Sequence, residues 1–239
     1  MISTPTFSPP SRRLTIAIDG PAGAGKSTVA REVARALGYT YIDTGAMYRA
    51  VAWAVLEHGI SPGDESAVTA LAEQLHIGLQ PGYSIDNPTR VFADSDEITD
   101  LIRTPSISNL TSPLSAIPGV RRRLVALQQA MGAKGGVVME GRDIGTVVLP
   151  NADIKVFLTA SLERRAERRQ AEMAERGTPV SYESLLADIA ARDTRDRSRE
   201  LSPLKAAPGA VILDSDHSTA QDVVQHILAL CNEAPPSHV

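Results

Sequence analysis

One glycine-rich stretch of the sequence, residues 20–28, has the residue types that phosphate binding needs. It reads Gly-Pro-Ala-Gly-Ala-Gly-Lys-Ser-Thr and fits the G-x-x-x-x-G-K-S pattern of loops that bind nucleoside triphosphates. Glycine lets the backbone approach a ligand closely, so that successive N–H groups can point at phosphate oxygens. The lysine adds a positive charge for the β- and γ-phosphates, and the serine hydroxyl suits Mg²⁺.

The segments on either side of this loop indicate whether the motif match reflects a phosphate-binding loop. Residues 14–19 form a short apolar run that predicts a buried strand. Behind the loop, Val29, Val33 and Leu37 recur at the spacing of one helix face, and the glycine that follows is suited to end that helix. Strand, glycine loop and helix is the setting that the motif requires, which disfavours a merely flexible turn. The predicted triphosphate-binding residues are Gly20, Pro21, Ala22, Gly23, Ala24, Gly25, Lys26, Ser27 and Thr28.

The composition limits the classes of protein that this sequence can represent. Its 239 residues, of which 43% are hydrophobic, can bury a substantial core. A net charge of −4 disfavours a general nucleic-acid-binding protein, which is typically basic. Cys231 is the one cysteine, and no apolar run approaches the ~18 residues of a membrane span. Residues 1–13 lack the apolar segment of a secretory signal, so we expect a cytoplasmic protein.

Strands and helices are predicted to alternate along most of the chain, which is typical of a parallel sheet covered on both faces. The expected strands are residues 14–19, 39–43, 137–140, 154–158 and 211–214. The expected helices are residues 29–37, 44–57, 107–116, 119–131, 162–176 and 182–199, and a C-terminal helix that Ser218 and Gln221 open as a capping box. Within residues 60–105 the alternation breaks, and a short helix at 65–74 with strand-like pieces at 76–80 and 90–93 predicts a small antiparallel insert.

Three further segments combine arginine with acidic or hydroxyl neighbours. They are residues 43–49 (Asp-Thr-Gly-Ala-Met-Tyr-Arg), 140–143 (Glu-Gly-Arg-Asp) and 192–199 (Arg-Asp-Thr-Arg-Asp-Arg-Ser-Arg). The first two follow predicted strands, and ligands of open α/β sheets bind at the carboxyl ends of strands, so their arginines can meet a second anionic group. Alone, the third segment alternates in charge as exposed ion-pair faces do. The arginines and glutamates of residues 162–176 have the spacing of ordinary pairs on a helix surface.

Taken together and in this order, the motifs resemble the bacterial cytidylate kinase family. The match includes Gly-Arg-Asp-Ile-Gly-Thr-Val-Val-Leu-Pro at residues 141–150, extends to residues 102–104, 112 and 118–121, and covers about residues 14–230. The resemblance implies an α/β fold, the P-loop NTPase three-layer sandwich with a parallel central sheet. It also implies a small, mainly antiparallel insert in the monophosphate-binding region and a short helical lid.

The resemblance further implies a division of the chain. The kinase core is expected at residues 14–59 and 106–230, with the lid at about 163–180 and the insert at 60–105. We expect residues 1–13 to be a disordered tail and residues 231–239 to be a flexible one.

Roles for individual residues also come from the resemblance. The residues expected to bind CMP are Thr44, Arg49, Ser112, Arg121, Arg142, Asp143, Arg192, Asp196 and Arg199. Of these, Arg49, Arg142 and Arg199 would hold the phosphate, and Ser112, Arg121 and Asp143 would read the cytosine. Arg192 and Asp196 would reach the sugar hydroxyls, with Thr44 at the base or sugar edge. The expected catalytic residues are Lys26, Arg142, Arg168 and Arg199, and the lid candidates that would cover the transferred phosphoryl group are Arg165, Arg168 and Arg169.

The implied reaction transfers the γ-phosphoryl group of ATP to CMP or dCMP, with Mg²⁺ bound by Ser27. The chain is expected to be a monomer that binds neither nucleic acid nor a membrane. The alternative is a kinase of the same fold for another small acceptor, such as UMP. A GTP-dependent switch is disfavoured, because the sequence has no Asn-Lys-x-Asp segment to read guanine.

Overall fold

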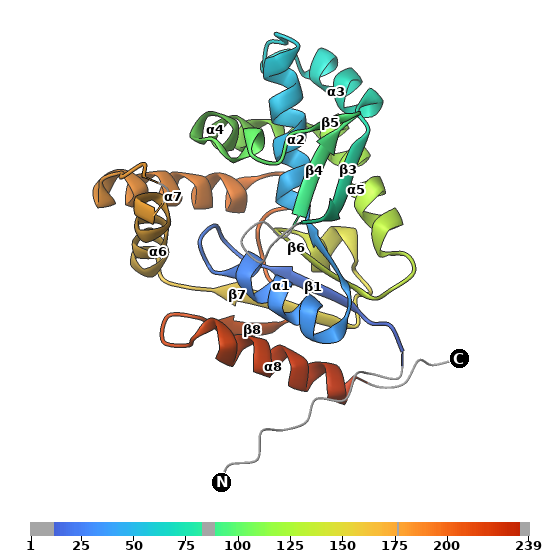
Figure 1. Ribbon diagram of the computed structural model, residues 1–239, viewed down its shortest axis with the longest axis vertical. Coiled ribbons are helices and arrows are strands. Elements are labelled where there is room, and N and C mark those ends of the chain that lie inside the picture. Colours follow the sequence, from blue (N-terminus) through green and yellow to red (C-terminus); the bar gives the residue numbers. More distant parts are fainter. Residues whose placement is uncertain (1–11, 83–88, 176, 235–239) are drawn as a thin grey trace.

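The computed structural model describes residues 12–82, 89–175 and 177–234 (Figure 1). Most of the predicted N-terminal tail therefore lies outside the described residues, as do residues 83–88 between the two expected strand-like pieces. Arg12 is described, and its Nη2 donates to Asp153 Oδ1 at 2.7 Å. The expected C-terminal tail does not begin at residue 231, because the last helix continues to Glu233 and buries Cys231 in the core.

The centre of the fold is a five-stranded parallel sheet, as predicted. Its strands lie in the order β2-β6-β1-β7-β8. Their bounds are β1 Thr15–Asp19, β2 Thr40–Asp43, β6 Val137–Gly141, β7 Ile154–Thr159 and β8 Val211–Asp214. The register pairs Asp19 with Gly141 and Asp43 with Glu140, so the carboxyl ends of β1, β2 and β6 lie side by side.

Both faces of this sheet are covered, which makes the three-layer sandwich. On one face, Ile16 and Ile18 of β1 pack against α1 (Lys26–Leu37) and α8 (Ala220–Glu233). On the other face, Ala17 packs with Ile144 and Val148 of η2 (Ile144–Val148), a π-helix that the sequence did not predict. Figure 1 shows α8, in red, running along the β8 side of the sheet. Alternate residues of one strand thus anchor both helical layers.

The chain between β2 and β6 forms a second body of structure beside the sheet. Its helices are α2 (Thr44–Glu57), α3 (Glu65–Gln74), α4 (Pro105–Leu114) and α5 (Pro118–Gly132), with a 3-10 turn, η1 (Leu101–Arg103). The predicted antiparallel pieces are β3 (Ile77–Pro81) and β4 (Thr89–Ala93), and a third strand, β5 (Asp96–Glu97), was not predicted. Val68 and Val91 of this region share a buried cluster with Val51 of α2 and Leu124 of α5. The insert is therefore packed through apolar contacts and is not a polar addition to the surface, while its limits at residues 60 and 105 stay a prediction.

Two helices, α6 (Leu162–Glu175) and α7 (Tyr182–Ser198), complete the fold between β7 and β8. Figure 1 shows them together at one side of the molecule, with α7 passing below α4 toward the sheet. None of the helices within the described ranges combines the length and the apolar character that a bilayer crossing needs.

The start of α8 differs from the prediction by one residue and by its partner. The N-cap is Thr219, whose hydroxyl accepts from the N–H of Asp222, while the Asp222 carboxylate accepts from the N–H of Thr219. The capping box predicted for Ser218 and Gln221 is therefore wrong. Asp222, at the third helical position, accepts the hydrogen bond from the N-cap residue, and this makes Thr219 the N-cap.

This cap gives a prediction with a matched control. We expect Thr219→Ala to lower the free energy of unfolding by about 1 kcal/mol, which for a chain of this size shifts the melting temperature by roughly 2–4 °C. Ser218→Ala should leave the melting temperature unchanged, because Ser218 precedes the cap. Thermal melts followed by circular dichroism measure both, and a larger loss in Ser218→Ala would contradict the assignment.

Candidate active site

The phosphate loop joins β1 to α1 and owes its shape to glycines with positive φ. Gly20, Gly23 and Gly25 have φ angles of 150°, 78° and 89°, a range that favours glycine. At Gly20 a side chain is also excluded by space, because an added Cβ would lie 2.0 Å from the carbonyl oxygen of Leu158. Gly25 is the N-cap of α1, and no side chain caps this helix. The first N–H groups of α1 therefore remain available to an anion.

Lys26 is buried beside this loop, with 6% of its surface exposed. Its Nζ donates to the carbonyl oxygen of Pro21 at 2.7 Å. Burial lowers the pKa of Lys26 below its usual value, and the positive charges of Arg142 and Arg192 lower it further. The Glu140 carboxylate opposes this pKa shift only in part. A bound polyphosphate would favour the charged ammonium group by bringing negative charge next to it.

Asp19, the last residue of β1, ties the phosphate loop to the segment that follows β6. Its Oδ1 and Oδ2 accept from the N–H groups of Ile144 and Gly145, both at 2.8 Å. Burial raises the pKa of Asp19 to about 6, although the two backbone hydrogen bonds oppose the shift. From the sequence, Asp19 was predicted only as the end of a strand. Its place directly before the glycine loop was the available signal.

Glu140 is buried at the end of β6, beside the phosphate loop, and its carboxylate accepts from the Tyr41 hydroxyl. Burial raises the pKa of Glu140, and the neighbouring Asp43 raises it further, while Lys26 and hydrogen bonds from Tyr41 and Ser27 oppose the shift. Glu140 and Ser27 thus place a carboxylate and a hydroxyl oxygen together. Mg²⁺ prefers oxygen ligands and is bound by one or two carboxylates together with substrate phosphates and water, so this donor set fits it. Within the described residues, no group of three or more His, Cys, Asp or Glu side chains could hold a metal ion.

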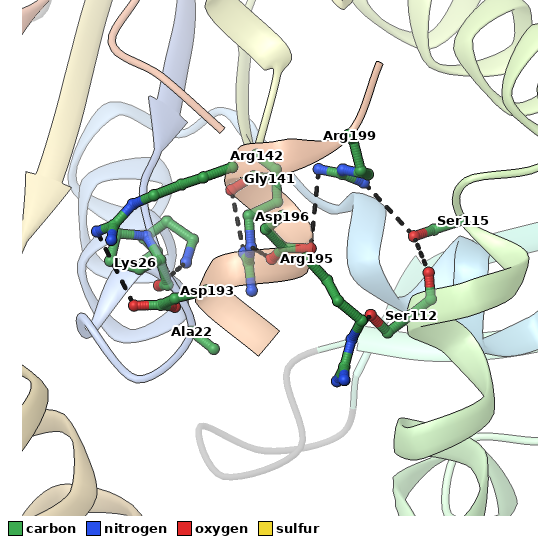
Figure 2. Close-up of polar contacts among 12 residues, drawn as sticks. Ala22, Lys26, Ser112, Ser115, Gly141, Arg142, Asp193, Arg195, Asp196 and Arg199 are labelled. Atoms are coloured by element: carbon green, nitrogen blue, oxygen red, sulfur yellow. Dashed lines mark hydrogen bonds and ion pairs between the residues drawn. The ribbon is translucent and has the colours of Figure 1, made fainter. Parts of the chain in front are cut away.

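Near Lys26, α7 contributes Asp196 to an arginine cluster. Arg142 Nε donates to Asp196 Oδ2 at 3.0 Å, and Arg199 Nη2 lies 3.9 Å from Asp196 Oδ1 (Figure 2). Burial alone would raise the pKa of Asp196, but the charges of Arg142, Arg199 and Arg192 lower it overall. The structure therefore brings together predicted residues that are more than 50 positions apart in the sequence.

Several buried guanidinium nitrogens in this cluster have no hydrogen-bond partner among the residues that the structure describes. They are the Nε atoms of Arg49, Arg192 and Arg199, and Nη2 of Arg199. Burial lowers the pKa of Arg192 to about 10, and the charge of Arg142 acts in the same direction. An unpaired buried donor costs free energy, and guanidinium groups bind phosphate bidentately. The arrangement is therefore suited to an anionic group held beside the phosphate loop.

A second buried ion pair lies next to this cluster. Arg121 Nη2 contacts Asp143 Oδ2, and Arg121 Nη1 donates to the carbonyl oxygen of Ser115 at 3.2 Å. The Arg121 guanidinium carbon lies 5.8 Å from the centre of the Tyr48 ring. The Tyr48 hydroxyl is buried and has no hydrogen-bond partner in residues 12–82, 89–175 and 177–234. Burial raises the pKa of Tyr48 to about 12. Polar groups in a fixed arrangement, partly unsatisfied, are suited to reading the edge of a planar ligand.

A family model for cytidylate kinase matches residues 16–233 of this chain. The chain belongs to the cytidylate kinase family. The cytidylate kinase of Carboxydothermus hydrogenoformans is 47% identical over 217 residues, which cover 91% of this chain and 96% of that protein. That of Exiguobacterium sp. (strain ATCC BAA-1283 / AT1b) is 48% identical over 222 residues, covering 93% and 98%.

Other relatives in the cytidylate kinase family are longer proteins. The bifunctional pantoate ligase/cytidylate kinase of Synechococcus sp. (strain JA-2-3B'a(2-13)) is 51% identical over 228 residues, but the match covers only 42% of its length. This chain thus spans less than half of those relatives. Among solved structures, an uncharacterized protein from Eubacterium ventriosum ATCC 27560 has a TM-score of 0.52 at 11% identity, covering 93% of this chain and 99% of that one. This likeness concerns the fold alone.

The two hydroxyl groups that the cytidylate kinase resemblance assigned to the nucleotide, like the charged residues above, already have partners in the structure. The Thr44 hydroxyl donates to the carbonyl oxygen of Glu140 at 2.7 Å and is buried. The Ser112 hydroxyl accepts from Arg195 Nε at 3.3 Å. Arg195, which lies within the segment 192–199, and Ser115, the C-cap of α4, were given no individual role from the sequence, because nothing local distinguishes them from neighbouring polar residues.

The predicted surface pairing of the α6 arginines is correct for two of them and wrong for the other two. Arg164 pairs with Glu167, and Arg169 pairs with Glu172, each three residues away. By contrast, Arg168 donates to the carbonyl oxygen of Ser215 at 2.5 Å and to its hydroxyl at 3.0 Å. Arg165 is buried against α7. Both depart from the pattern because long-range carbonyl and carboxylate acceptors face them, which helix spacing alone cannot reveal.

Proposed function

We propose that this chain catalyses transfer of the γ-phosphoryl group of ATP to CMP or dCMP, giving ADP and CDP or dCDP. The observation that carries the proposal is the group of buried guanidinium nitrogens of Arg49, Arg192 and Arg199 beside the phosphate loop that have no hydrogen-bond partner within the described part of the chain. One anion site at the N-terminus of α1 and another in this cluster are what a donor triphosphate and an acceptor monophosphate require. Membership of the cytidylate kinase family supports cytidylate as the acceptor.

On the donor side, residues 20–28 bind the phosphates of ATP through backbone N–H groups and the ammonium group of Lys26. Ser27 and Glu140 would hold Mg²⁺, and the bound ion would neutralise charge on the transferred phosphoryl group. Arg168 belongs to the same side, since a Cβ added at Gly25 would lie 3.9 Å from its Nη1. From there its guanidinium group can reach the phosphoryl group once it leaves Ser215.

On the acceptor side, Arg49, Arg142 and Arg199 bind the phosphate of CMP, while Arg192 and Asp196 reach the sugar hydroxyls. Burial of this cluster strengthens each of these contacts, because charges interact more strongly away from water. The acceptor phosphate is already anionic near neutral pH and attacks directly. Phosphoryl transfer then depends on positioning and on charge stabilisation, and no general base is needed.

The base of the acceptor lies against the Arg121–Asp143 pair, with Ser112 and Thr44 at its edge. An acidic side chain accepts a hydrogen bond from the exocyclic amino group of cytosine, as carboxylates do with cytosine in DNA. Uracil presents a carbonyl oxygen there, which a carboxylate disfavours. We further propose that the protein acts as a cytoplasmic monomer that binds neither nucleic acid nor a membrane.

One assay tests this function. ADP formation is measured with MgATP and each of CMP, dCMP, UMP, AMP and GMP at equal concentrations. We expect CMP and dCMP to be the preferred acceptors, no turnover without an acceptor, and loss of turnover when EDTA removes Mg²⁺. A clear preference for UMP would favour the alternative, a kinase of the same fold for another monophosphate.

A further inference from the structure

A buried ion pair joins the two helices α6 and α7. Arg165 Nη2 lies 2.6 Å from Asp193 Oδ2, and Arg165 Nη1 lies 3.1 Å from Asp193 Oδ1. The two side chains are 4% and 6% exposed. The sequence pattern had indicated an exposed arginine at residue 165, and the resemblance had made it a candidate to cover the phosphoryl group. Its bidentate pairing with a carboxylate leaves it unsuited to that role.

The same guanidinium group also holds the phosphate loop. Arg165 Nη1 donates to the carbonyl oxygen of Ala22 at 3.1 Å, and Arg165 Nε donates to that of Ala160 at 3.1 Å. Gly23 approaches α6 so closely that an added Cβ would lie 3.1 Å from the Cβ of Arg165. The backbone of the phosphate loop at residues 22–23 is therefore set against α6 by this one arginine.

The next turn of α7 serves the acceptor side. Asp196 follows Asp193 by three residues, so the two residues lie on the same face of the helix, with a rise of about 4.5 Å along its axis between their Cα atoms. Asp196 binds Arg142, while Arg195 contacts Ser112 of α4 and Arg199 contacts Ser115, the C-cap of α4. Figure 2 shows Asp193 on the side of α7 toward Ala22 and Lys26, and Arg195 and Arg199 extending toward Ser112 and Ser115.

We propose that Arg165 and Asp193 are positioning residues that couple the two substrate sites through α7. A monophosphate that draws Arg142, Asp196 and Arg199 together fixes the position of α7. Asp193 moves with α7 as part of the same helix. Because Arg165 pairs with Asp193 and donates to the carbonyl oxygen of Ala22, the position of α7 also fixes the backbone of the phosphate loop at Ala22. Each substrate then favours the arrangement that the other needs, which is positive coupling of two binding free energies. The inference rests on the proposed function for the identity of the two ligands.

The test measures this coupling directly. The dissociation constant of a non-hydrolysable ATP analogue with Mg²⁺ is determined by calorimetry with and without saturating CMP, and the ratio of the two values is the coupling factor. We expect a factor of at least about fivefold for the natural chain, the lower end of typical values. In Arg165→Met/Asp193→Leu the factor should fall below twofold. Replacing both partners by apolar side chains avoids the uncompensated buried charge that a single replacement leaves.

Two further variants separate positioning from stability. Arg165→Lys keeps the charge but loses the planar guanidinium group that reaches Asp193 and Ala22 together. We therefore expect a coupling factor between those of the natural chain and the double variant. If the double variant does not fold, the coupling factor of Arg165→Lys tests the inference. Arg164→Met is the matched control, because Arg164 pairs with Glu167 on the surface of the same helix. Its factor should equal that of the natural chain.

A lowered melting temperature with an unchanged coupling factor, in the double variant or in Arg165→Lys, would show that the pair is only structural and overturn the inference. A factor near one in the natural chain would also overturn it. These results are distinguishable from a failure of the proposed function, which would appear as absent phosphorylation of CMP by the natural chain in the acceptor assay.

Discussion

Replacement of Lys26 by methionine is expected to lower kcat by about 10²–10³-fold, the scale for removing one group that stabilises charge in a transition state. Lys26 is buried beside the phosphate loop and donates to the Pro21 carbonyl, and in the proposed function its ammonium group turns to the phosphates. Methionine keeps the apolar stem of the side chain and removes the charge. Turnover is measured by ADP formation with saturating CMP and MgATP.

The fold of this variant should be preserved. Burial lowers the pKa of Lys26 in the ligand-free protein, so the charged form is not what stabilises the fold. We expect the ligand-free melting temperature to be unchanged or higher. The rise that MgATP causes in the natural chain should become smaller, since stabilisation by a bound ligand grows with the logarithm of its affinity. Lys134→Met, at an exposed position, is the control and should behave as the natural chain. Near-normal turnover in Lys26→Met would contradict the triphosphate assignment.

The phosphate loop could be predicted almost completely from sequence because its chemistry is local. The loop, the strand before it and the helix behind it are consecutive, and each has its own signal in residues 14–38. The parallel sheet followed from alternation of strands and helices, and the five strands lie where they were expected. The order β2-β6-β1-β7-β8 was not predicted, since strand order depends on packing between distant segments.

The contacts that complete the site are long-range, and this is why sequence reasoning missed them. Asp19 binds Ile144 and Gly145, which are 125 and 126 residues away. Arg165 of α6 pairs with Asp193 of α7, although helix spacing suggested nearby glutamates of α6 as partners. The run at 192–199 alternates in charge, and only the fold distinguishes buried Asp193 and Asp196 from their exposed neighbours. Roles assigned by resemblance to the individual residues of the acceptor site remain predictions.

Arg142 and Asp143 are adjacent, yet their replacement is expected to change kcat/KM for CMP and UMP in different ways. Arg142 donates to Asp196 in the arginine cluster, whereas Asp143 is buried against Arg121. Every nucleoside monophosphate has the phosphate, so Arg142→Met should lower kcat/KM for CMP and UMP alike. A loss of about 10- to 150-fold corresponds to roughly 1.5–3 kcal/mol for a hydrogen bond to a charged group. The ratio of the two kcat/KM values should stay nearly constant.

Asp143→Asn should instead change that ratio. Asparagine keeps an oxygen for Arg121, which avoids leaving a buried guanidinium group without a partner, and it adds an N–H donor that can meet the carbonyl oxygen of uracil. The preference for CMP over UMP should therefore narrow by roughly 5- to 150-fold, equivalent to about 1–3 kcal/mol of base discrimination. Measuring kcat/KM for both acceptors with both variants decides the assignment. If Arg142→Met shifts the ratio and Asp143→Asn does not, the phosphate and base roles of these two residues are reversed.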